Sequence, residues 1–171
     1  MTVERAVGSI LEAPIVTSFT RVGFDVRSRL AHWAELSSYD LTGRVVAITG
    51  ATSGIGLVAA ERLASCNAGV VLIGRSRAKT EQVREQVAAR SGNERLDVVV
   101  ADMGDLDAVR AAAAEVQRRH ARLDALIHNA ASLSATRQLA PSGIELTMAS
   151  QVVGPFLLTG LLLDRLRHSS P

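Results

Sequence analysis

From position 41 onward, short and mostly apolar runs alternate with longer segments in which apolar residues recur at helical spacing. Such runs are typical of strands that are buried on both faces of a parallel sheet. They predict strands over 45–48, 70–73, 96–100 and 123–127. Strands that alternate with helices over short turns form right-handed crossovers, so the pattern predicts an α/β fold with a doubly wound parallel sheet.

The segments between and after these strands predict helices. A first helix ends near 67–69, and further helices cover 77–90, 105–120 and 144–167, the last one after a loop over 129–141. The face of the first helix that we expect to be buried is marked by Ile55, Val58, Ala59 and Leu63. In the last helix, Pro155 predicts a kink.

Residues 1–40 form a leader of a different kind, ahead of a domain over 41–171. Apolar residues recur in the leader at Phe19, Val22, Val26, Leu30 and Trp33. Their spacing predicts one or two amphipathic helices. Four arginines against five acidic residues leave residues 1–43 with a net charge of −1. Because helices that lie on membranes are rich in Lys and Arg, we expect the leader to pack against the domain or a partner instead.

The composition is that of a globular protein, with 47% hydrophobic and 21% charged residues among 171. The net charge of +2 is too balanced to indicate nucleic acid or a membrane surface as a partner. The most apolar stretch, 152–163, has 12 residues and a Gly-Pro break, whereas a membrane span needs about 20. We therefore expect a cytoplasmic protein without a membrane span. A homo-oligomer is one of the states that we expect for it.

Metal and disulfide chemistry find little support in the sequence. Cys66 is the only cysteine, which excludes an internal disulfide and a cysteine-based zinc site. The four histidines show no metal-ligand spacing, so we predict no metal site.

A glycine-rich turn over 49–56 (TGATSGIG) lies between the first predicted strand and the first predicted helix. Gly50 permits a sharp turn, Gly54 lets the backbone approach a pyrophosphate, and Gly56 permits close packing of helix on strand. The helix N-terminus adds N–H groups that point toward an anion. The turn therefore predicts a dinucleotide site, which also includes Thr52, Ser53 and Ile55. The sequence has neither a P-loop nor a G-x-S-x-G nucleophile turn.

Three motifs follow successive strands. The turn T-G-x-x-x-G-x-G follows the first, Asp102-Met103 the third, and His128-Asn129-Ala130-Ala131 the fourth. With these motifs, residues 41–171 resemble the short-chain dehydrogenase/reductase family, whose fold is of the Rossmann type. The resemblance implies that the three glycines line the cofactor phosphates and that Asp102, with Met103 beside it, accepts from the adenine amino group. It also implies that Asn129 braces the fourth strand and that Ala130 lies near the cofactor ribose.

Two finer resemblances concern the ends of the chain. Residues 151–159 resemble the fourth helix of the retinol-dehydrogenase-like branch, and the leader over 19–24 resembles that of the dehydrogenase/reductase member 12 type. Two positions depart from the family. Ala131 stands where glycine is usual, and Gln151 occupies the place of an Asn that ties the catalytic lysine to a water chain in relatives.

The residues after the second strand bear on the choice between NADP and NAD. An NAD site of this type generally needs a carboxylate there for the ribose 2′-hydroxyl. Arg75 and Arg77 follow the strand instead, and the first acid is Glu81. An arginine attracts a 2′-phosphate, whereas a carboxylate repels it. These residues favour NADP over NAD, with Arg75 as the ligand of the 2′-phosphate. The alternative is that both arginines are only solvated residues at the start of the helix.

The machinery of hydride transfer is missing. By the resemblance, a tyrosine four residues before a lysine acts as the acid/base, but Tyr39 is followed at that spacing by Gly43, and Lys79 lies in the second predicted helix. We therefore assign no catalytic residue. The favoured interpretation is the N-terminal part of an NADP-dependent reductase or dehydrogenase acting on a small carbonyl or alcohol, truncated after about four strands. The alternatives are a non-catalytic NADP-binding module and a Rossmann-like methyltransferase.

Overall fold

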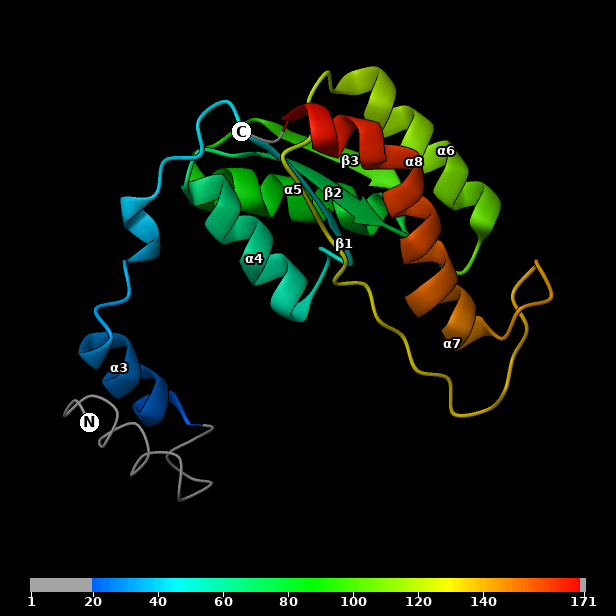
Figure 1. The fold of residues 1–171 in the computed structure, drawn as a ribbon, viewed down its shortest axis with the longest axis horizontal. Helices are drawn as coiled ribbons and strands as arrows, with labels where there is room; N and C mark the ends of the chain where they lie inside the picture. The colour runs from blue at the N-terminus through cyan, green and yellow to red at the C-terminus, as the bar shows by residue number, and fades with distance from the viewer. Residues whose placement is uncertain (1–19, 170–171) are drawn as a thin grey trace. The chain divides into compact units, whose positions relative to one another are not determined.

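The computed structural model describes residues 20–169. Contacts divide the chain into two compact units, Met1–Ser38 and Tyr39–Pro171. The elements of the second unit, shown in Figure 1, are β1 (Val45–Thr49), α4 (Gly54–Ser65), β2 (Gly69–Gly74), α5 (Arg77–Ser91), β3 (Leu96–Val100), α6 (Leu106–Arg119), β4 (Ala125–Ile127), α7 (Leu146–Met148), a π-helix (Ala149–Val153) and α8 (Gly154–Ser169).

The four strands form one parallel sheet in the order β3-β2-β1-β4. Val46 of β1 lies opposite Val70 of β2 on one side and Ala125 of β4 on the other. The chain moves outward from β1 to β3 and then crosses back to β4, so the strand order reverses between β1 and β4. This arrangement confirms the predicted Rossmann-type α/β fold.

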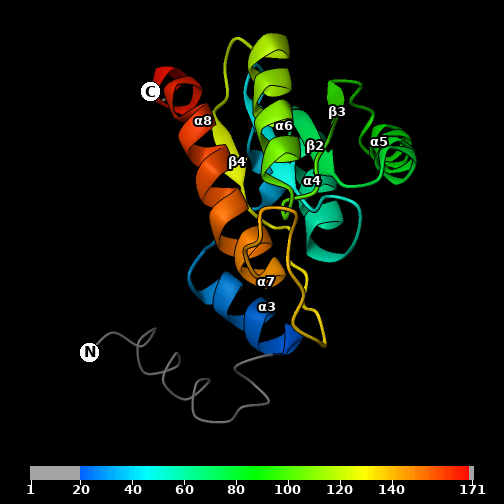
Figure 2. The same cartoon turned by 90° about the vertical axis from the view of Figure 1, so that its right-hand side faces the viewer.

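Helices cover both faces of the sheet, and each face has its own apolar core (Figure 2). Alternate residues of β1 point to opposite faces: Ala47 belongs to the core under α6 and α8, whereas Val46 and Ile48 belong to the core under α4 and α5. All three are at most 5% exposed. Burial on both faces explains why the strands read as continuous apolar runs.

The buried face of α4 differs from the predicted one. Ile55 and Val58 are 82% and 54% exposed, and the residues buried against the sheet are Gly56, Ala60 and Ala64. These three recur every four residues and carry little or no side chain, so the helix backbone lies close to the strands. Of the predicted face, Ala59 and Leu63 pack against the same core, whereas Ile55 and Val58 are displaced toward solvent.

The last helical segment is also organised differently from the prediction. The irregularity lies in the π-helix at Ala149–Val153, ahead of Pro155. Pro155 directly follows the π-helix inside the continuous helical stretch Leu146–Ser169, where a proline has no N–H to donate to the preceding turn. By length and composition, one described helical stretch, Leu146–Ser169, could cross a membrane. A core helix passes the same test, and Leu158 and Leu162 are buried in this one, so the absence of a span stays a prediction.

The described part of the leader contains α3 (Arg21–Leu30) and a 3₁₀ turn at Leu36–Ser38. Thr20 caps α3 by accepting a hydrogen bond from the N–H of Gly23. The ring of Phe24 meets that of Trp33 edge-on, with centroids 5.5 Å apart. Val22 and Trp33 are more than half exposed, Leu30 is 37% exposed and Val26 is partly buried, so most of the predicted apolar face is exposed in the described part of this unit. Phe19 lies outside the described residues.

Candidate cofactor site

The glycine-rich turn connects β1 to α4 and approaches the segment after β4 closely. Gly50 has φ +68° and its N–H donates to the carbonyl of Ile73. A Cβ on Gly50 would lie 2.7 Å from the Cα of Ala130, so any larger residue would push the two loops apart. A Cβ on Gly56 would overlap with the Nδ2 of Asn129 and the carbonyl oxygen of Gly50. The turn therefore has this shape only because both positions are glycine.

The N-terminus of α4 is open at the turn. Ser53 is the N-cap residue, but its side chain makes no capping hydrogen bond. Gly54 has φ +54°, and nothing lies within 4 Å of where its Cβ would be. The first N–H groups of a helix without a side-chain cap are free to bind an anion.

Thr49 and Asn129 join the ends of β1 and β4. The N–H groups of Asn129 and Ala130 both donate to the hydroxyl of Thr49, at 3.1 Å each. The side-chain amide of Asn129 donates to the carbonyls of Thr49 and Gly50, at 3.2 and 3.1 Å. Thr49 itself is only 1% exposed. These bonds hold the two strand ends together at the point where the strand order reverses.

A cavity of about 600 Å³ crosses the carboxyl ends of the strands at this point. Of the residues predicted to bind a cofactor, those that line it are Gly50, Thr52, Ser53, Ile55, Arg75, Asp102, Met103, Asn129 and Ala130. Gly54 and Gly56 are not among its lining residues, and Gly56 is buried beneath the turn. The structure thus brings nine of the predicted residues around one cavity, while their binding roles stay predictions.

Other lining residues were not predicted from the sequence. They are Ile73, Gly74, Ser76, Lys79, Ala101, Ala131, Ser132 and Ser150. A signal for Lys79 was present: Ser76 caps α5 by accepting from the N–H of Lys79, and this places the lysine in the first turn after Arg75. Ser132 and Ser150 had no such signal, because an irregular loop and a π-helix bring them to the cavity.

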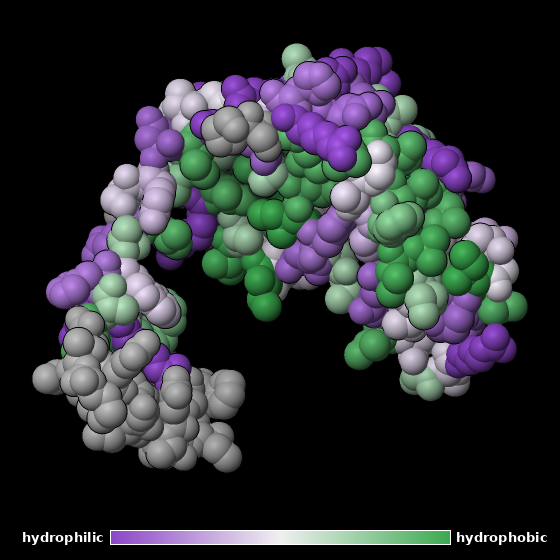
Figure 3. Space-filling model, in the orientation of Figure 1, coloured by the Kyte–Doolittle hydropathy of each residue, from purple (hydrophilic) through white to green (hydrophobic). Residues whose placement is uncertain are grey.

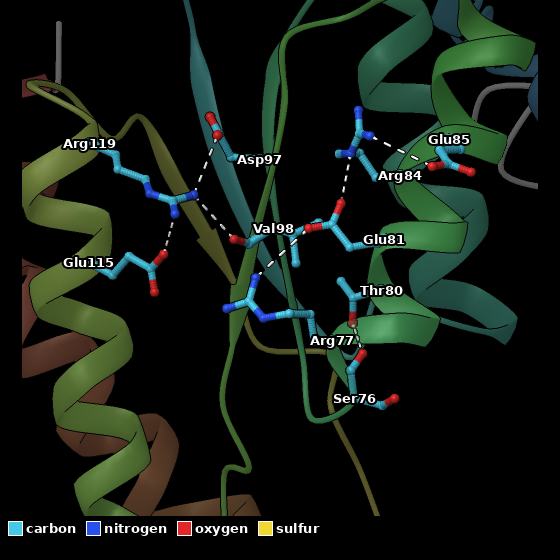
Figure 4. A network of polar contacts seen from close by, with 10 residues as sticks. All are labelled: Ser76, Arg77, Thr80, Glu81, Arg84, Glu85, Asp97, Val98, Glu115 and Arg119. Carbon is cyan, nitrogen blue, oxygen red and sulfur yellow. Dashed lines mark hydrogen bonds and ion pairs between the residues drawn. The ribbon is translucent and has the colours of Figure 1, made fainter.

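Two cationic side chains face the cavity. Arg77, which the sequence analysis also considered, does not line it. Arg75 and Lys79 line it, and no carboxylate within the described ranges pairs with either. Arg77 pairs instead with Glu81 at 3.8 Å, in a network that continues to Arg84 (Figure 4). The cavity end next to β2 is therefore positively charged through Arg75 and Lys79.

Asp102 and Met103 lie at the end of β3. The N–H of Gly104 donates to Asp102 Oδ1 at 2.8 Å, which fixes the carboxylate in position. Asp102 is exposed and Met103 is 6% exposed, so a polar acceptor and an apolar wall stand side by side. This combination suits a heteroaromatic base that carries an amino group.

Gln151 lies in the π-helix and is directed to the segment after β4. Its Nε2 donates to the carbonyl of Ser132 at 2.7 Å.

Among residues 20–169, no cluster of three His, Cys, Asp or Glu side chains has the arrangement of a metal site. The glycine cradle, the open helix N-terminus and the two unpaired cations fit a nucleotide that carries several phosphates.

Comparisons with known proteins agree with this geometry. Residues 44–170 match the family described as short chain dehydrogenase. The chain is 42% identical over 131 residues to dehydrogenase/reductase SDR family member 13 of Bos taurus, covering 77% of this chain and 34% of that protein. It is 34% identical over 146 residues to retinol dehydrogenase 11 of Homo sapiens, covering 85% and 46%.

A solved structure has the same fold. L-Sorbose reductase from Gluconobacter frateurii, in complex with NADPH and L-sorbose, has a TM-score of 0.66 and 26% identity, over 75% of this chain and 49% of that one. The chain thus spans between about a third and a half of the length of these proteins. The predicted resemblance to the retinol-dehydrogenase-like branch is confirmed, while residues 19–24 lie outside the family match. The chain belongs to the short-chain dehydrogenase family.

Proposed function

We propose that this chain binds NADP(H) in the cavity at the carboxyl ends of β1, β2 and β4. The observation that carries the proposal is the glycine cradle between Gly50 and Ala130 beneath an uncapped helix N-terminus. In open α/β sheets, ligands bind where the strand order reverses, and a diphosphate is held by helix N–H groups. The NADPH that L-sorbose reductase holds supports a nicotinamide dinucleotide here as well.

The preference for NADP(H) over NAD(H) rests on Arg75 and Lys79. Both line the cavity end next to β2, and within the described chain neither has a carboxylate partner that would neutralise it. Two free cations favour a 2′-phosphate, because each adds a charge-assisted hydrogen bond that NAD(H) cannot receive. A ribose without this phosphate would be left beside two unneutralised positive charges.

The activity that we propose for the whole protein is hydride transfer between NADP(H) and a small carbonyl or alcohol. When bound, the nicotinamide supplies the hydride, and the residues of this chain hold and orient the nucleotide. None of the 171 residues forms a Tyr-x-x-x-Lys pair, so we expect the chain alone to bind without turnover. The dehydrogenase and reductase names of its relatives support an oxidoreductase over a non-catalytic module, and the family match removes the support for a methyltransferase.

Calorimetric titration of the 171-residue chain with NADPH and NADH tests this proposal. We expect NADPH to bind with a Kd about tenfold lower than that of NADH, which corresponds to about 1.4 kcal/mol of binding free energy. Arg75→Asp should remove or reverse this preference. Arg77→Asp is the matched control, because it makes the same change in charge at a residue that pairs with Glu81 and is not among the lining residues of the cavity. Failure of both nucleotides to bind, or tighter binding of NADH, would contradict the proposal.

A further inference from the structure

Arg75 and Lys79, the two cations that line the cavity, belong to a segment whose side chains lie outside the core. Residues 75–79 are all exposed. In the described chain, the side-chain hydrogen bonds and ion pairs of this segment end on α5 or on its cap residue, Ser76. Neither cation is therefore bonded to the sheet through its own side chain.

Thr80 is the first residue after β2 whose side chain is buried. It is 0% exposed, and its Oγ1 donates to the carbonyl of Ser76 at 2.8 Å (Figure 4). A β-branched side chain has few rotamers, and a hydroxyl that bonds the preceding turn restricts them further. Thr80 is thus a fixed side chain at the start of α5.

This side chain packs directly against the last residue of β2. A Cβ on Gly74 would overlap with Thr80 Oγ1 and would lie 3.1 Å from the Cγ2 of Thr52 in the glycine-rich turn. The carbonyl of Gly74 accepts from the N–H of Ala101 after β3, at 3.1 Å. The contact between Gly74 and Thr80 therefore joins α5 to the sheet at a point that is itself well fixed.

The two cations stand next to the two residues of this contact. Arg75 directly follows Gly74, and Lys79 directly precedes Thr80. Two neighbouring positive charges repel each other, and no carboxylate in the described chain pairs with either of them. A segment anchored at both ends keeps both cations at the cavity in spite of this repulsion. The arrangement suits a doubly charged phosphate group that contacts both.

We infer that Thr80 is a positioning residue that holds Arg75 and Lys79 in place for the 2′-phosphate of NADP(H). The inference rests on the proposed function. Thr80 is not among the lining residues of the cavity, so it acts through the two cations. Cations that are held in place beforehand lose less conformational freedom when the phosphate binds. NAD(H) lacks this phosphate and gains nothing from the contact.

Calorimetric titration of variants with NADPH and NADH separates this role from a general structural one. We expect Thr80→Ala to raise the Kd of NADPH about three- to tenfold, the cost of ordering one long side chain, and to leave the Kd of NADH close to its original value. Thr80→Ser keeps the hydroxyl that bonds Ser76, so it should retain most of the affinity for NADPH. Val83→Ala is the matched control, because Val83 is buried on the same helix and does not line the cavity. It should lower stability without changing the preference between the nucleotides.

Gly74→Ala tests the contact from its other side. The added methyl group overlaps with Thr80, so Gly74→Ala alone should also weaken the binding of NADPH. Thr80→Ala provides space for this methyl group. The double variant should therefore raise the Kd of NADPH by less than the product of the two separate increases. Gly74→Ala leaves Thr80 unchanged, so it keeps the test if Thr80→Ala does not fold.

Three results would overturn the role of Thr80. They are an equal rise in the Kd of both nucleotides or an unchanged Kd of NADPH in Thr80→Ala, a loss of preference in Val83→Ala that is just as large, and independent effects of Gly74→Ala and Thr80→Ala. If the unmodified chain binds neither nucleotide or does not prefer NADPH, the proposed function fails first. That result differs from a failure of the Thr80 inference, in which the unmodified chain still prefers NADPH.

Discussion

At the scale of single residues, Asp124 has the most strongly perturbed carboxylate that the described chain contains. It accepts from the N–H of Val45 and the guanidinium of Arg44, both at 2.8 Å, and also pairs with Arg122. Burial alone would raise the pKa of Asp124, but the hydrogen bonds from Arg122, Arg44 and Val45 outweigh burial and hold the pKa well below its usual value. This carboxylate thereby ties the start of β1 to the approach to β4.

Asp124→Asn should lower the free energy of unfolding by about 1–3 kcal/mol at pH 7, because asparagine keeps one acceptor oxygen but loses the negative charge that pairs with Arg44 and Arg122 at this partly buried position. The effect should depend on pH with a defined sign. A carboxyl whose pKa is lowered by folding contributes its full stability above the unfolded pKa of about 3.9, and this contribution is lost as the pH falls below it.

Urea unfolding at pH 7 and at pH 3 measures this dependence. The difference in stability between the unmodified chain and Asp124→Asn should shrink at pH 3. A difference that is the same at both pH values would show that the carboxylate charge does not stabilise the fold.

At the scale of elements, two glycines of α8 lie in opposite surroundings. A Cβ on Gly154 would overlap with the carbonyl oxygen of Met103, so the helix starts in direct contact with the β3–α6 loop. A Cβ on Gly160, six residues later on the same helix, would meet nothing within 4 Å. The start of α8 is thus fixed by close packing, whereas its middle is open on one side.

We expect Gly154→Ala to destabilise the protein by about 1–3 kcal/mol, because the added methyl group has no space. Gly160→Ala should stabilise it by up to about 1 kcal/mol, since alanine is the better helix former at an exposed position. Thermal unfolding followed by circular dichroism compares the two variants. Equal effects of the two substitutions would contradict the close approach of α8 to Met103.

The free edge of β3 has a side-chain cover. Arg119 at the end of α6 donates to the carbonyl of Val98 at 3.3 Å, and it also pairs with Asp97 and Glu115 (Figure 4). An unpaired strand edge is a site at which other chains can add a strand, and charged side chains hinder this. Just before β4, the hydroxyl of Ser169 accepts from the N–H of Leu123 at 2.8 Å, whereas no charged side chain bonds the free edge of Ala125–Ile127 in the described part of the chain.

At the scale of the whole molecule, apolar surface gathers beside that second edge. In the described residues β4 pairs only with β1, and Val152 and Phe156 of the last helical segment are 54% and 82% exposed. Figure 3 shows hydrophobic side chains over α8 and over the region between α8 and α4. Exposed apolar patches of this kind are typical of surfaces that bind another protein surface or cause aggregation.

We therefore expect the 171-residue chain to self-associate as its concentration rises. Sedimentation velocity at several concentrations measures this, and the double variant Val152→Glu with Phe156→Glu should shift the distribution toward the monomer. Arg167→Glu, at an exposed position of the same helix, is a control that makes the same change in net charge. A monodisperse monomer at every concentration would contradict this prediction.

Much of the fold was predictable because it follows from local patterns. Apolar runs mark the strands that are buried on both faces, and Gly50, Gly54 and Gly56 mark the turn after the first of them. The predicted burial of Ile55 and Val58 was wrong, because helical spacing alone does not say that a glycine–alanine face packs closer to a sheet than a face of larger residues. Lys79 was missed as a residue of the site, because the cap at Ser76 that positions it was not considered.

The sequence by itself determined the alternation of strands and helices, the glycine-rich turn and the basic residues that follow the second strand. Each of these depends on residues close together in the chain, so local chemistry specifies them. Only the tertiary structure decided that Lys79 lines the cavity while Arg77 pairs with Glu81, and that Gln151 contacts Ser132 across 19 residues. Such contacts depend on how an irregular loop and a widened helix pack against the sheet, and no periodicity in the sequence encodes this.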